Sequence, residues 1–318
     1  MADARKKRKI NKDFWLFIFL AIIYLIHLYI DYKQNQQQTV NVNGVLYVHM
    51  IDCGQADSFL FEYEGEYALI DCGTKSTGKD VVEYLKKQNV NKLKFVIGTH
   101  PHDDHMGGMK TVIENFETEL IYMPETKDGL VTSDWYISLL QEIKKDNISV
   151  ENPSVNDKYY LGDAVFNVVE QLTPEEAGNN INDYSTVVKV SFGEMDLLMT
   201  GDAEKKVESK IMQSYNNLEC EILKLGHHGS DTSTSDKFLD EVNPQYGLIS
   251  CGVDNKYNHP CESTMQKLKD RDIQVYRTDE VGDVVVSITS DEISFDKDPG
   301  SYNYGKGAPE FERGIYDD

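Results

Sequence analysis

The chain has 318 residues, of which 40% are hydrophobic, enough apolar sequence for one large folded domain or two small ones. Its formal net charge is −22, and a surface this acidic repels polyanions at long range, which weakens the case for a nucleic-acid substrate without excluding one. The five cysteines include no CxxC pair, which argues against a cysteine zinc knuckle.

The N-terminus has the pattern of a membrane anchor. Residues 1–13 are basic, and residues 14–30 are apolar except for His27, at the short end of the length that spans a bilayer. We predict a transmembrane helix at 14–31 through which the chain contacts the membrane. The basic residues ahead of it predict a cytoplasmic N-terminus and an extracytoplasmic remainder. A signal peptide cleaved to release a secreted chain is the alternative, although no small-x-small cleavage site follows the apolar run.

Residues 32–44 are polar and are predicted to be a tether, whereas residues 45–297 have the strand-rich pattern of a folded domain. Period-two alternation bounded by turn residues predicts its strands, and helical periodicity predicts its helices. Strands are expected at 46–51, 58–63, 67–73, 95–98, 160–172, 185–199, 222–225, 246–250 and 284–295, and helices at 78–88, 136–145, 203–215 and 263–270. Residues 298–318 are rich in Gly, Tyr and Asp and are predicted to be a mobile acidic tail.

A dense group of imidazoles and carboxylates follows the strand expected at 95–98. It places His100, His102, Asp104 and His105 on a turn that leads from this strand into a helix. Imidazole nitrogens and carboxylate oxygens are ligands that zinc, manganese and iron accept. Unpaired imidazoles held this close together would repel one another on protonation. The cluster therefore predicts a site for one or two divalent metal ions, with zinc or manganese expected.

The spacing His100-x-His102-x-Asp104-His105 resembles the HxHxDH signature of the metallo-β-lactamase superfamily. This resemblance implies an α/β (α+β) fold, a four-layer αββα sandwich, here preceded by the one transmembrane helix. It also implies that a first metal takes the first two histidines and that a second takes Asp104 and His105. The substrate is not implied, because a fold does not fix it.

Three later segments extend this resemblance. Asp202 follows an apolar strand, where the superfamily has a bridging ligand, although Gly-Asp at a strand end is by itself an ordinary turn. Of His227 and His228, the superfamily pattern favours His228 as the metal ligand and leaves His227 to orient a carboxylate or to touch substrate. His259, in a polar loop, is either a proton donor, a phosphate ligand or a solvent-exposed histidine.

The motifs together resemble the hydrolase domain of ComEC-type competence proteins over about residues 45–295. They are Asp52-x-Gly54-Gln55-x-Asp57, Leu69-Ile70-Asp71-x-Gly73, the HxHxDH cluster, Thr200-Gly201-Asp202, Leu223-Lys224-x-x-His227-His228-Gly229-Ser230 and Asn258-His259-Pro260. The competence channel is not expected, because one hydrophobic span is present. No histidine lies between His105 and His227, so the usual third ligand of the first metal is missing, and Asn180, Asn182 or Ser185 occupies that region.

The predicted chemistry is metal-dependent hydrolysis of an ester or a phosphodiester. A divalent metal supplies a Lewis acid and lowers the pKa of a bound water to about 7. Asp104 or Asp202 is expected to orient the water, and His227 or His259 to protonate the leaving oxygen. The ComEC-type resemblance implies a phosphodiesterase or nuclease with a phosphodiester substrate such as single-stranded DNA. The alternatives are a cell-envelope esterase similar to phosphocholine esterases, a lactone or thioester hydrolase, and a non-catalytic metal-binding protein. No protein partner is identifiable from the sequence.

Overall fold

The structure is a computed structural model that describes residues 42–305 together with Leu20 and Tyr24. The predicted transmembrane helix at 14–31, the basic segment before it and most of the tether lie outside the described residues. Residues 306–318 of the predicted tail also lie outside them. Among the residues described, no helix is both long enough and apolar enough to cross a bilayer.

Two large sheets form the centre of residues 42–305. The first sheet has the order β17-β16-β1-β2-β3-β5-β7-β8 and the second has the order β15-β14-β13-β12-β11-β10-β9. The strands of the first sheet are β1 (Leu46–Met50), β2 (Phe59–Tyr63), β3 (Glu66–Ile70), β5 (Phe95–Ile97), β7 (Leu120–Tyr122), β8 (Ser149–Glu151), β16 (Val284–Ile288) and β17 (Ile293–Phe295). Those of the second are β9 (Lys158–Leu161), β10 (Ala164–Glu170), β11 (Val187–Phe192), β12 (Met195–Met199), β13 (Ile222–Lys224), β14 (Tyr246–Ile249) and β15 (Gln274–Arg277). A further two-stranded sheet pairs β4 (Lys92–Leu93) with β6 (Glu117–Thr118).

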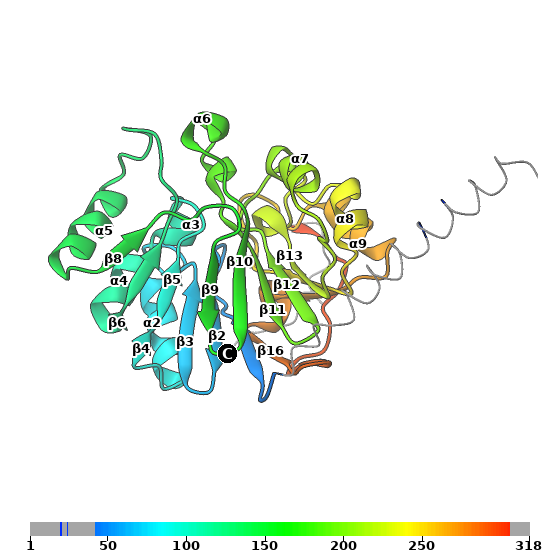
Figure 1. The fold of residues 1–318 in the computed structure, drawn as a ribbon, viewed down its shortest axis with the longest axis horizontal. Coiled ribbons are helices and arrows are strands. Elements are labelled where there is room, and N and C mark those ends of the chain that lie inside the picture. The colour runs from blue at the N-terminus through cyan, green and yellow to red at the C-terminus, as the bar shows by residue number, and fades with distance from the viewer. Residues whose placement is uncertain (1–19, 21–23, 25–41, 306–318) are drawn as a thin grey trace, which may run out of the picture. The chain divides into compact units, whose positions relative to one another are not determined.

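Helices cover both outer faces of the sheet pair (Figure 1). The first sheet carries α2 (Gly78–Lys87), α4 (Met109–Asn115) and α5 (Asp134–Lys145), and the second carries α7 (Lys205–Ser214), α8 (Asp236–Val242) and α9 (Glu262–Lys269). Shorter helices are α3 (Asp103–Met106), α6 (Pro174–Ala177), η1 (Ile181–Tyr184), η2 (Gly226–Gly229) and α10 (Thr278–Val281). The residues described therefore form the four layers that the αββα resemblance implies.

Three apolar cores hold these layers together. The central core lies between the sheets, where Phe61 of β2 meets Phe166 of β10 with their ring centroids 4.9 Å apart. A second core packs α2, α4 and α5 on the first sheet, and a third packs α7, α8 and α9 on the second. Burial of apolar surface in these cores stabilises the fold by about 25 cal/mol per Å². The cores thereby hold in place the sheet edge that carries the polar motifs.

The polar motifs gather at one edge because the strands before them run parallel. β3 and β5 are parallel in the first sheet, and β12, β13 and β14 are parallel in the second. Parallel strands bring their carboxyl ends to the same edge of a sheet, which is where open α/β sheets bind ligands. The segments after β5, β12 and β13 carry His100 to His105, Asp202 and His228.

The packed chain continues beyond residue 297, where the sequence placed the end of the domain. Gly300 donates its N–H to Val275 O at 2.7 Å, and Tyr302 donates its hydroxyl to Ile273 O at 2.8 Å. The buried Arg277 donates to the carbonyls of Ser301 and Asn303. Residues 300–305 therefore form part of the folded unit, which corrects the boundary drawn from composition. Composition alone cannot show that backbone carbonyls of a polar segment satisfy a buried guanidinium.

Candidate metal centre

The HxHxDH cluster lies across the start of a short helix. His102 is the N-cap residue of α3, and Asp104 and His105 belong to this four-residue helix, which was not predicted from the sequence. The helix expected after the turn follows as α4, whose N-cap residue is Gly108. Gly108 also allows close packing, because a Cβ added to it would lie 2.1 Å from Cys72 O. Together with the hydrogen bond that the N–H of Cys72 donates to His105 O at 2.7 Å, this packing holds α3 against the segment that follows β3.

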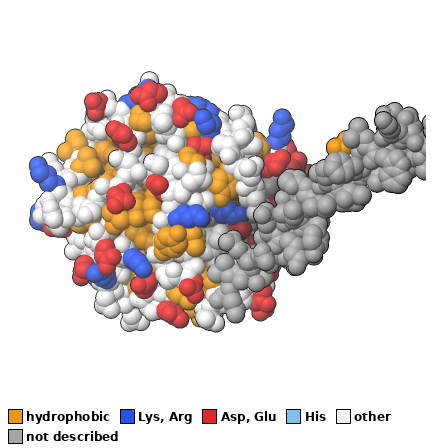
Figure 2. Space-filling model, viewed as in Figure 1, with side chains coloured by type: hydrophobic (Ala, Val, Ile, Leu, Met, Phe, Trp, Pro, Cys, Tyr) orange, Lys and Arg blue, Asp and Glu red, His pale blue; other side chains and the backbone are white. Residues whose placement is uncertain are grey.

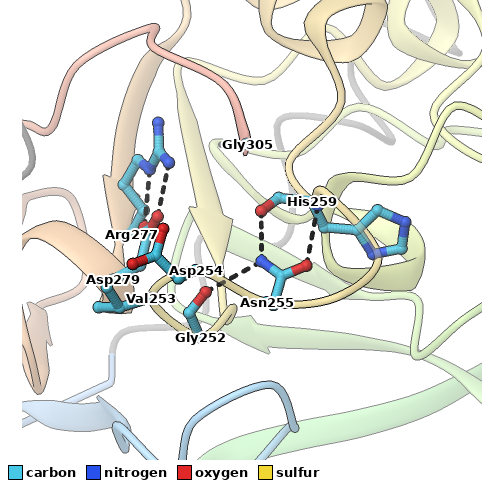
Figure 3. A pocket seen from close by; sticks show the side chains of 8 residues that line it. All are labelled: Gly252, Val253, Asp254, Asn255, His259, Arg277, Asp279 and Gly305. Atoms are coloured by element: carbon cyan, nitrogen blue, oxygen red, sulfur yellow. Dashed lines mark hydrogen bonds and ion pairs between the residues drawn. The ribbon is translucent and has the colours of Figure 1, made fainter. Parts of the chain in front are cut away.

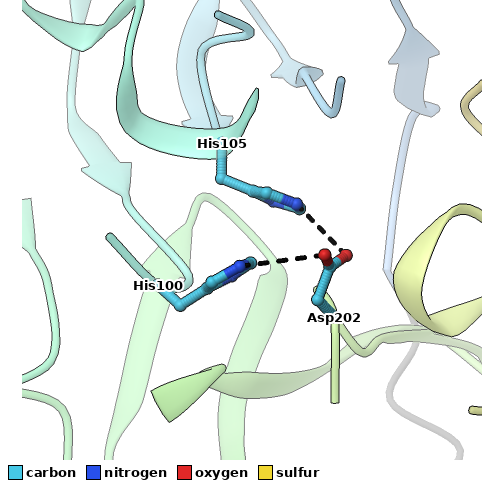
Figure 4. Close-up of side chains that lie close together, drawn as sticks. All are labelled: His100, His105 and Asp202. Carbon is cyan, nitrogen blue, oxygen red and sulfur yellow. Dashed lines mark ion pairs between the residues drawn. The ribbon is translucent and has the colours of Figure 1, made fainter. Parts of the chain in front are cut away.

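Asp202 lies at the centre of the predicted ligands, as Figure 4 shows for His100 and His105. Its Oδ1 atom is 3.1 Å from His105 Nε2, and its Oδ2 atom is 3.8 Å from His100 Nε2. These three residues are buried, and their ligand atoms form one compact group. The structure therefore brings Asp202 together with the histidine cluster, and its role as a bridging ligand stays a prediction.

A second group of donors adjoins the first. His228 Nε2 lies 3.4 Å from Asp104 Oδ2 and 3.8 Å from Asp202 Oδ1, and His105 contributes to this group as well. His102 belongs to neither compact group, but its Nδ1 atom lies 3.0 Å from His100 Nε2. The structure thus brings together His100, Asp104, His105, Asp202 and His228, and places His102 beside them.

The donor set fits a divalent metal ion. The buried atoms His105 Nε2, His228 Nε2 and Asp202 Oδ1 have no hydrogen-bond partner, a condition that costs free energy unless a cation binds there. Two ligands of one tetrahedral zinc with bonds of 2.0–2.1 Å lie about 3.4 Å apart, close to the 3.0–3.8 Å separations seen here. His100, His102, Asp104, His105, Asp202 and His228 are the residues that would hold the metal.

Hydrogen bonds to the other ring nitrogen fix which nitrogen of each histidine faces the centre. His105 Nδ1 lies 2.7 Å from Asp71 Oδ2, and His228 Nδ1 donates to Ser250 O at 2.8 Å. A carbonyl can only accept, so His228 carries its proton on Nδ1 and presents Nε2 to the centre. Asp71 is itself held by the N–H and hydroxyl of Thr99. Outer partners of this kind orient metal ligands and raise their basicity.

A buried ion pair adjoins the same ligands, and it was not predicted from the sequence. Lys224 is fully buried, and its Nζ atom lies 2.7 Å from Asp57 Oδ2. The other oxygen of Asp57 lies 3.3 Å from His228 Nδ1. Asp57 and Lys224 both appeared in the family-like motifs, and the position of Lys224 within a three-residue apolar strand was the one local sign that it is buried.

The charges around the centre perturb its histidines in opposite directions. Burial alone would lower the pKa of both His105 and His228. The carboxylates of Asp202 and Asp71 nevertheless raise the pKa of His105 well above its ordinary value, and Asp202 and Asp57 raise that of His228 to about 10. Burial and the neighbouring His105 hold the pKa of His100 well below its ordinary value. Metal binding therefore has to displace protons from His105 and His228.

His227 and His228 differ in their surroundings, because both adopt a left-handed backbone conformation, with φ angles of 50° and 54°. Their difference in role stays a prediction. His228 is fully buried in the centre, whereas His227 is partly exposed with its Nε2 atom 3.6 Å from Asp202 Oδ2. The Nδ1 atom of His227 lies 3.4 Å from Asn182 Nδ2 and 3.2 Å from Thr232 Oγ1.

The region of the missing third histidine is occupied by two of the three polar residues named from the sequence. Ser185 Oγ accepts the N–H of Asp202 at 3.1 Å and lies 3.4 Å from His100 Nδ1. Asn182 faces His227 and the carboxylate of Glu204. Asn180 lies farther out, where it donates to the other oxygen of Glu204. Of these three residues, Ser185 is thus the one that contacts His100.

The centre opens into a cleft of about 400 Å³, within the range of small-molecule sites. The cleft is lined by Gln55, His102, Asp103, Asp104, Asn182, Asp202, His227, His228, Tyr257 and His259. His259 is largely buried at its edge, and its ring centroid lies 5.4 Å from that of His227. Burial lowers the pKa of His259 to about 4, so its imidazole is neutral near pH 7. It can therefore donate an N–H hydrogen bond, but it is a poor source of a full proton.

Comparisons with known proteins agree with this geometry. The profile of the Metallo-beta-lactamase superfamily matches residues 51–253. ComE operon protein 3 of Bacillus subtilis is 27% identical over 304 residues, which cover 85% of this chain and 38% of that protein. Competence protein ComA of Neisseria gonorrhoeae is 30% identical over 233 residues, which cover 72% of this chain and 30% of that protein. The chain therefore spans about a third of the length of these relatives.

A solved structure shows the same fold at low sequence identity. The metallo-beta-lactamase fold protein YhfI from Bacillus subtilis superposes with a TM-score of 0.50 and 13% identity, covering 79% of this chain and 100% of that one. The strand order, the buried donor set and these matches have one explanation. The chain belongs to the metallo-beta-lactamase superfamily of metal-dependent hydrolases, as a relative of the ComEC-type competence proteins.

Proposed function

We propose that this chain is a phosphodiesterase that uses zinc or manganese and cleaves single-stranded nucleic acid. The observation that carries the proposal is the buried donor set around Asp202, whose unpartnered atoms lie at the floor of a polar cleft. Similarity to competence proteins over most of the chain favours a phosphodiester over a lactone or a thioester. A metal bound there would polarise the phosphoryl group and acidify water.

The residues of the cleft have separate tasks in this proposal. The nearby imidazoles of His228 and His105 outweigh burial and hold the pKa of Asp104 well below its ordinary value, so Asp104 is a carboxylate at neutral pH. As a carboxylate it accepts a hydrogen bond from the attacking water and orients it. His227 faces the cleft beside Asp202 and is placed to protonate the leaving oxygen. His259, being neutral, donates an N–H hydrogen bond to a phosphoryl oxygen.

We also propose that residues 14–31 anchor the chain in a membrane with the hydrolase domain outside the cytoplasm. The basic segment and the apolar run that follows it support this arrangement. A fusion of a reporter enzyme to the C-terminus, active only outside the cytoplasm, tests the orientation. Release of the chain by carbonate washing, or reporter activity on the cytoplasmic side, would contradict the anchor or its orientation.

The hydrolytic activity is tested with the full chain in detergent, loaded with zinc or manganese. Single-stranded DNA, bis-p-nitrophenyl phosphate, a lactone, a thioester and a phosphocholine ester are offered in parallel. We expect cleavage of the first two, and loss of that cleavage in Asp202→Asn. Turnover of the lactone, thioester or phosphocholine ester alone would assign the centre to another ester. No turnover of any substrate by a metal-loaded chain would contradict a hydrolytic role.

A further inference from the structure

An exposed aromatic ring stands at the rim of the metal centre. Tyr257 lines the same cleft as Asp104 and His228, and 52% of its surface is exposed. Its ring lies nearly parallel to that of His259, with the centroids 5.7 Å apart and the planes at 25°. Two adjacent flat rings at the mouth of a polar cleft form a surface on which a third flat group can stack.

The loop that carries this pair of rings is fixed by hydrogen bonds (Figure 3). Asn255 donates to the carbonyls of Gly252 and His259 and accepts the N–H of His259. Gln55, from the β1–β2 connection, accepts the N–H of Gly252 and also lies 3.4 Å from His259 Nδ1. Gly305 donates to Pro260 O from the C-terminal segment. The backbone of the loop and the His259 ring are therefore held in place before a ligand arrives, which lowers the entropy lost on binding.

The charge of the protein makes such a surface important for a nucleic-acid substrate. Most nucleic-acid binding draws its affinity from basic side chains that release counterions from phosphates. This chain has a net charge of −22, and on the face in Figure 2 the described basic side chains are interspersed with acidic ones. Affinity for a single strand therefore has to come from contacts that do not depend on net charge, and base stacking on an aromatic ring is such a contact.

Lys256 restricts the charge of the ligand that can stack on the Tyr257 ring. Its Nζ atom lies 4.8 Å from the centroid of the Tyr257 ring. A cationic headgroup such as choline would meet this ammonium at the ring and be repelled. A neutral nucleobase would displace the exposed lysine, because stacking of a base contributes more than a cation–π contact at an exposed site. The displaced ammonium would stay within reach of a phosphate next to the base.

We infer that Tyr257, backed by His259 and flanked by Lys256, is a stacking subsite for a nucleobase adjacent to the scissile phosphodiester. This inference rests on the proposed function and narrows its substrate to nucleic acid.

Binding of two strands tests the subsite. The full chain, loaded with metal, is titrated with a cleavage-resistant phosphorothioate oligothymidylate and with an abasic phosphorothioate strand of equal length. We expect wild type to prefer the strand with bases by about 5- to 150-fold, the range for stacking of one base. In Tyr257→Ala the two strands should bind about equally, and in Tyr257→Phe the preference should persist. The control is Tyr160→Ala, which removes a side chain of a residue that is 54% exposed on β9 and should leave the preference unchanged.

The outcomes separate this inference from the proposed function. Cleavage of single-stranded DNA by wild type with equal binding of the two strands would overturn the subsite and leave the phosphodiesterase intact. Loss of the preference in Tyr257→Phe would also overturn it, because the ring would not be the contact. Failure of wild type to bind either strand, together with failure to cleave ordinary single-stranded DNA, would remove both proposals. If phosphocholine displaces the bound strand and thymidine monophosphate does not, the ring would be assigned to a cationic headgroup instead.

Discussion

Replacement of Lys224 by methionine tests whether the buried ion pair beneath the metal centre positions its ligands. Lys224 is fully buried, donates to Leu225 O at 2.8 Å and lies 2.7 Å from Asp57. Methionine keeps most of the side-chain volume but removes the charge. The variant therefore leaves the Asp57 carboxylate buried without its cation, next to the Nδ1 atom of His228.

The size of the effect follows from the burial of the pair. Breaking a buried ion pair by removing one partner costs about 3–5 kcal/mol, because the remaining charge stays desolvated. Burial favours the neutral form of Asp57, and Lys224 is the first of the groups that oppose burial and keep its pKa low. A neutral Asp57 would no longer attract the proton on His228 Nδ1. Loss of such an outer partner lowers metal affinity by about 10- to 100-fold.

The assay separates stability from metal binding with a second variant. Unfolding in urea without metal and competition with a chelator are measured for wild type, Lys224→Met and the double variant Lys224→Met/Asp57→Asn. The double variant has no unpaired buried charge, so it should recover much of the stability while its metal affinity stays low. Recovery of both quantities would refute a positioning role. A loss of less than about 1 kcal/mol in Lys224→Met would refute the burial argument itself.

Four further predictions concern the centre and the C-terminal segment. Asp104→Asn should lower turnover at saturating metal by about 10²-fold or more with a near-normal unfolding midpoint without metal, whereas Asp134→Asn, in the first turn of α5, should keep wild-type turnover. His228→Ala should lower metal content and His227→Ala mainly turnover; metal analysis with the reverse pattern would exchange their roles. Removal of residues 298–318 should lower the free energy of unfolding by about 1.5–3 kcal/mol, since Arg277 loses its carbonyl partners; an unchanged urea midpoint would contradict this. The raised pKa of His228 stabilises the metal-free fold below pH 6.5, and this contribution should disappear as pH rises toward 10, as urea titrations across that window would show.

The sequence predicted what depends on local pattern. The apolar runs before His100, Asp202 and His228 are strands in the structure, so these ligands meet at one sheet edge. The group of metal ligands could be predicted because closely spaced imidazoles and carboxylates rarely occur in a protein that binds no metal. Short elements escaped prediction, among them β7 and α3, because three or four residues are too few to display a period.

The rest of the site depends on contacts between segments far apart in the chain. Nothing in the sequence around Lys224 names Asp57 as its partner, and a lysine is ordinarily exposed. The sequence treated His259 as a proton donor, but its burial and the resulting low pKa emerge only once its loop packs against Gln55 and Asn255. Likewise, the domain was predicted to end at residue 297 because the sequence does not show which residues the following segment contacts. In the structure these partners lie on β15 and α10.

The two oxygens of Asp202 divide the centre into unequal halves. Oδ1 faces His105 and His228, where Asp104 completes a set of four donors. Oδ2 faces His227 and His100, at 3.6 Å and 3.8 Å. Ser185, which lies 3.4 Å from His100 Nδ1, already accepts the N–H of Asp202 and is a weak metal ligand in its hydroxyl form. The Oδ1 side therefore has a second carboxylate that the Oδ2 side lacks, and a first metal ion should be held there more tightly than a second on the Oδ2 side. The weaker half is the one that adjoins His102 and His227 at the cleft, so in the proposed function a phosphoryl group would approach the centre from this side.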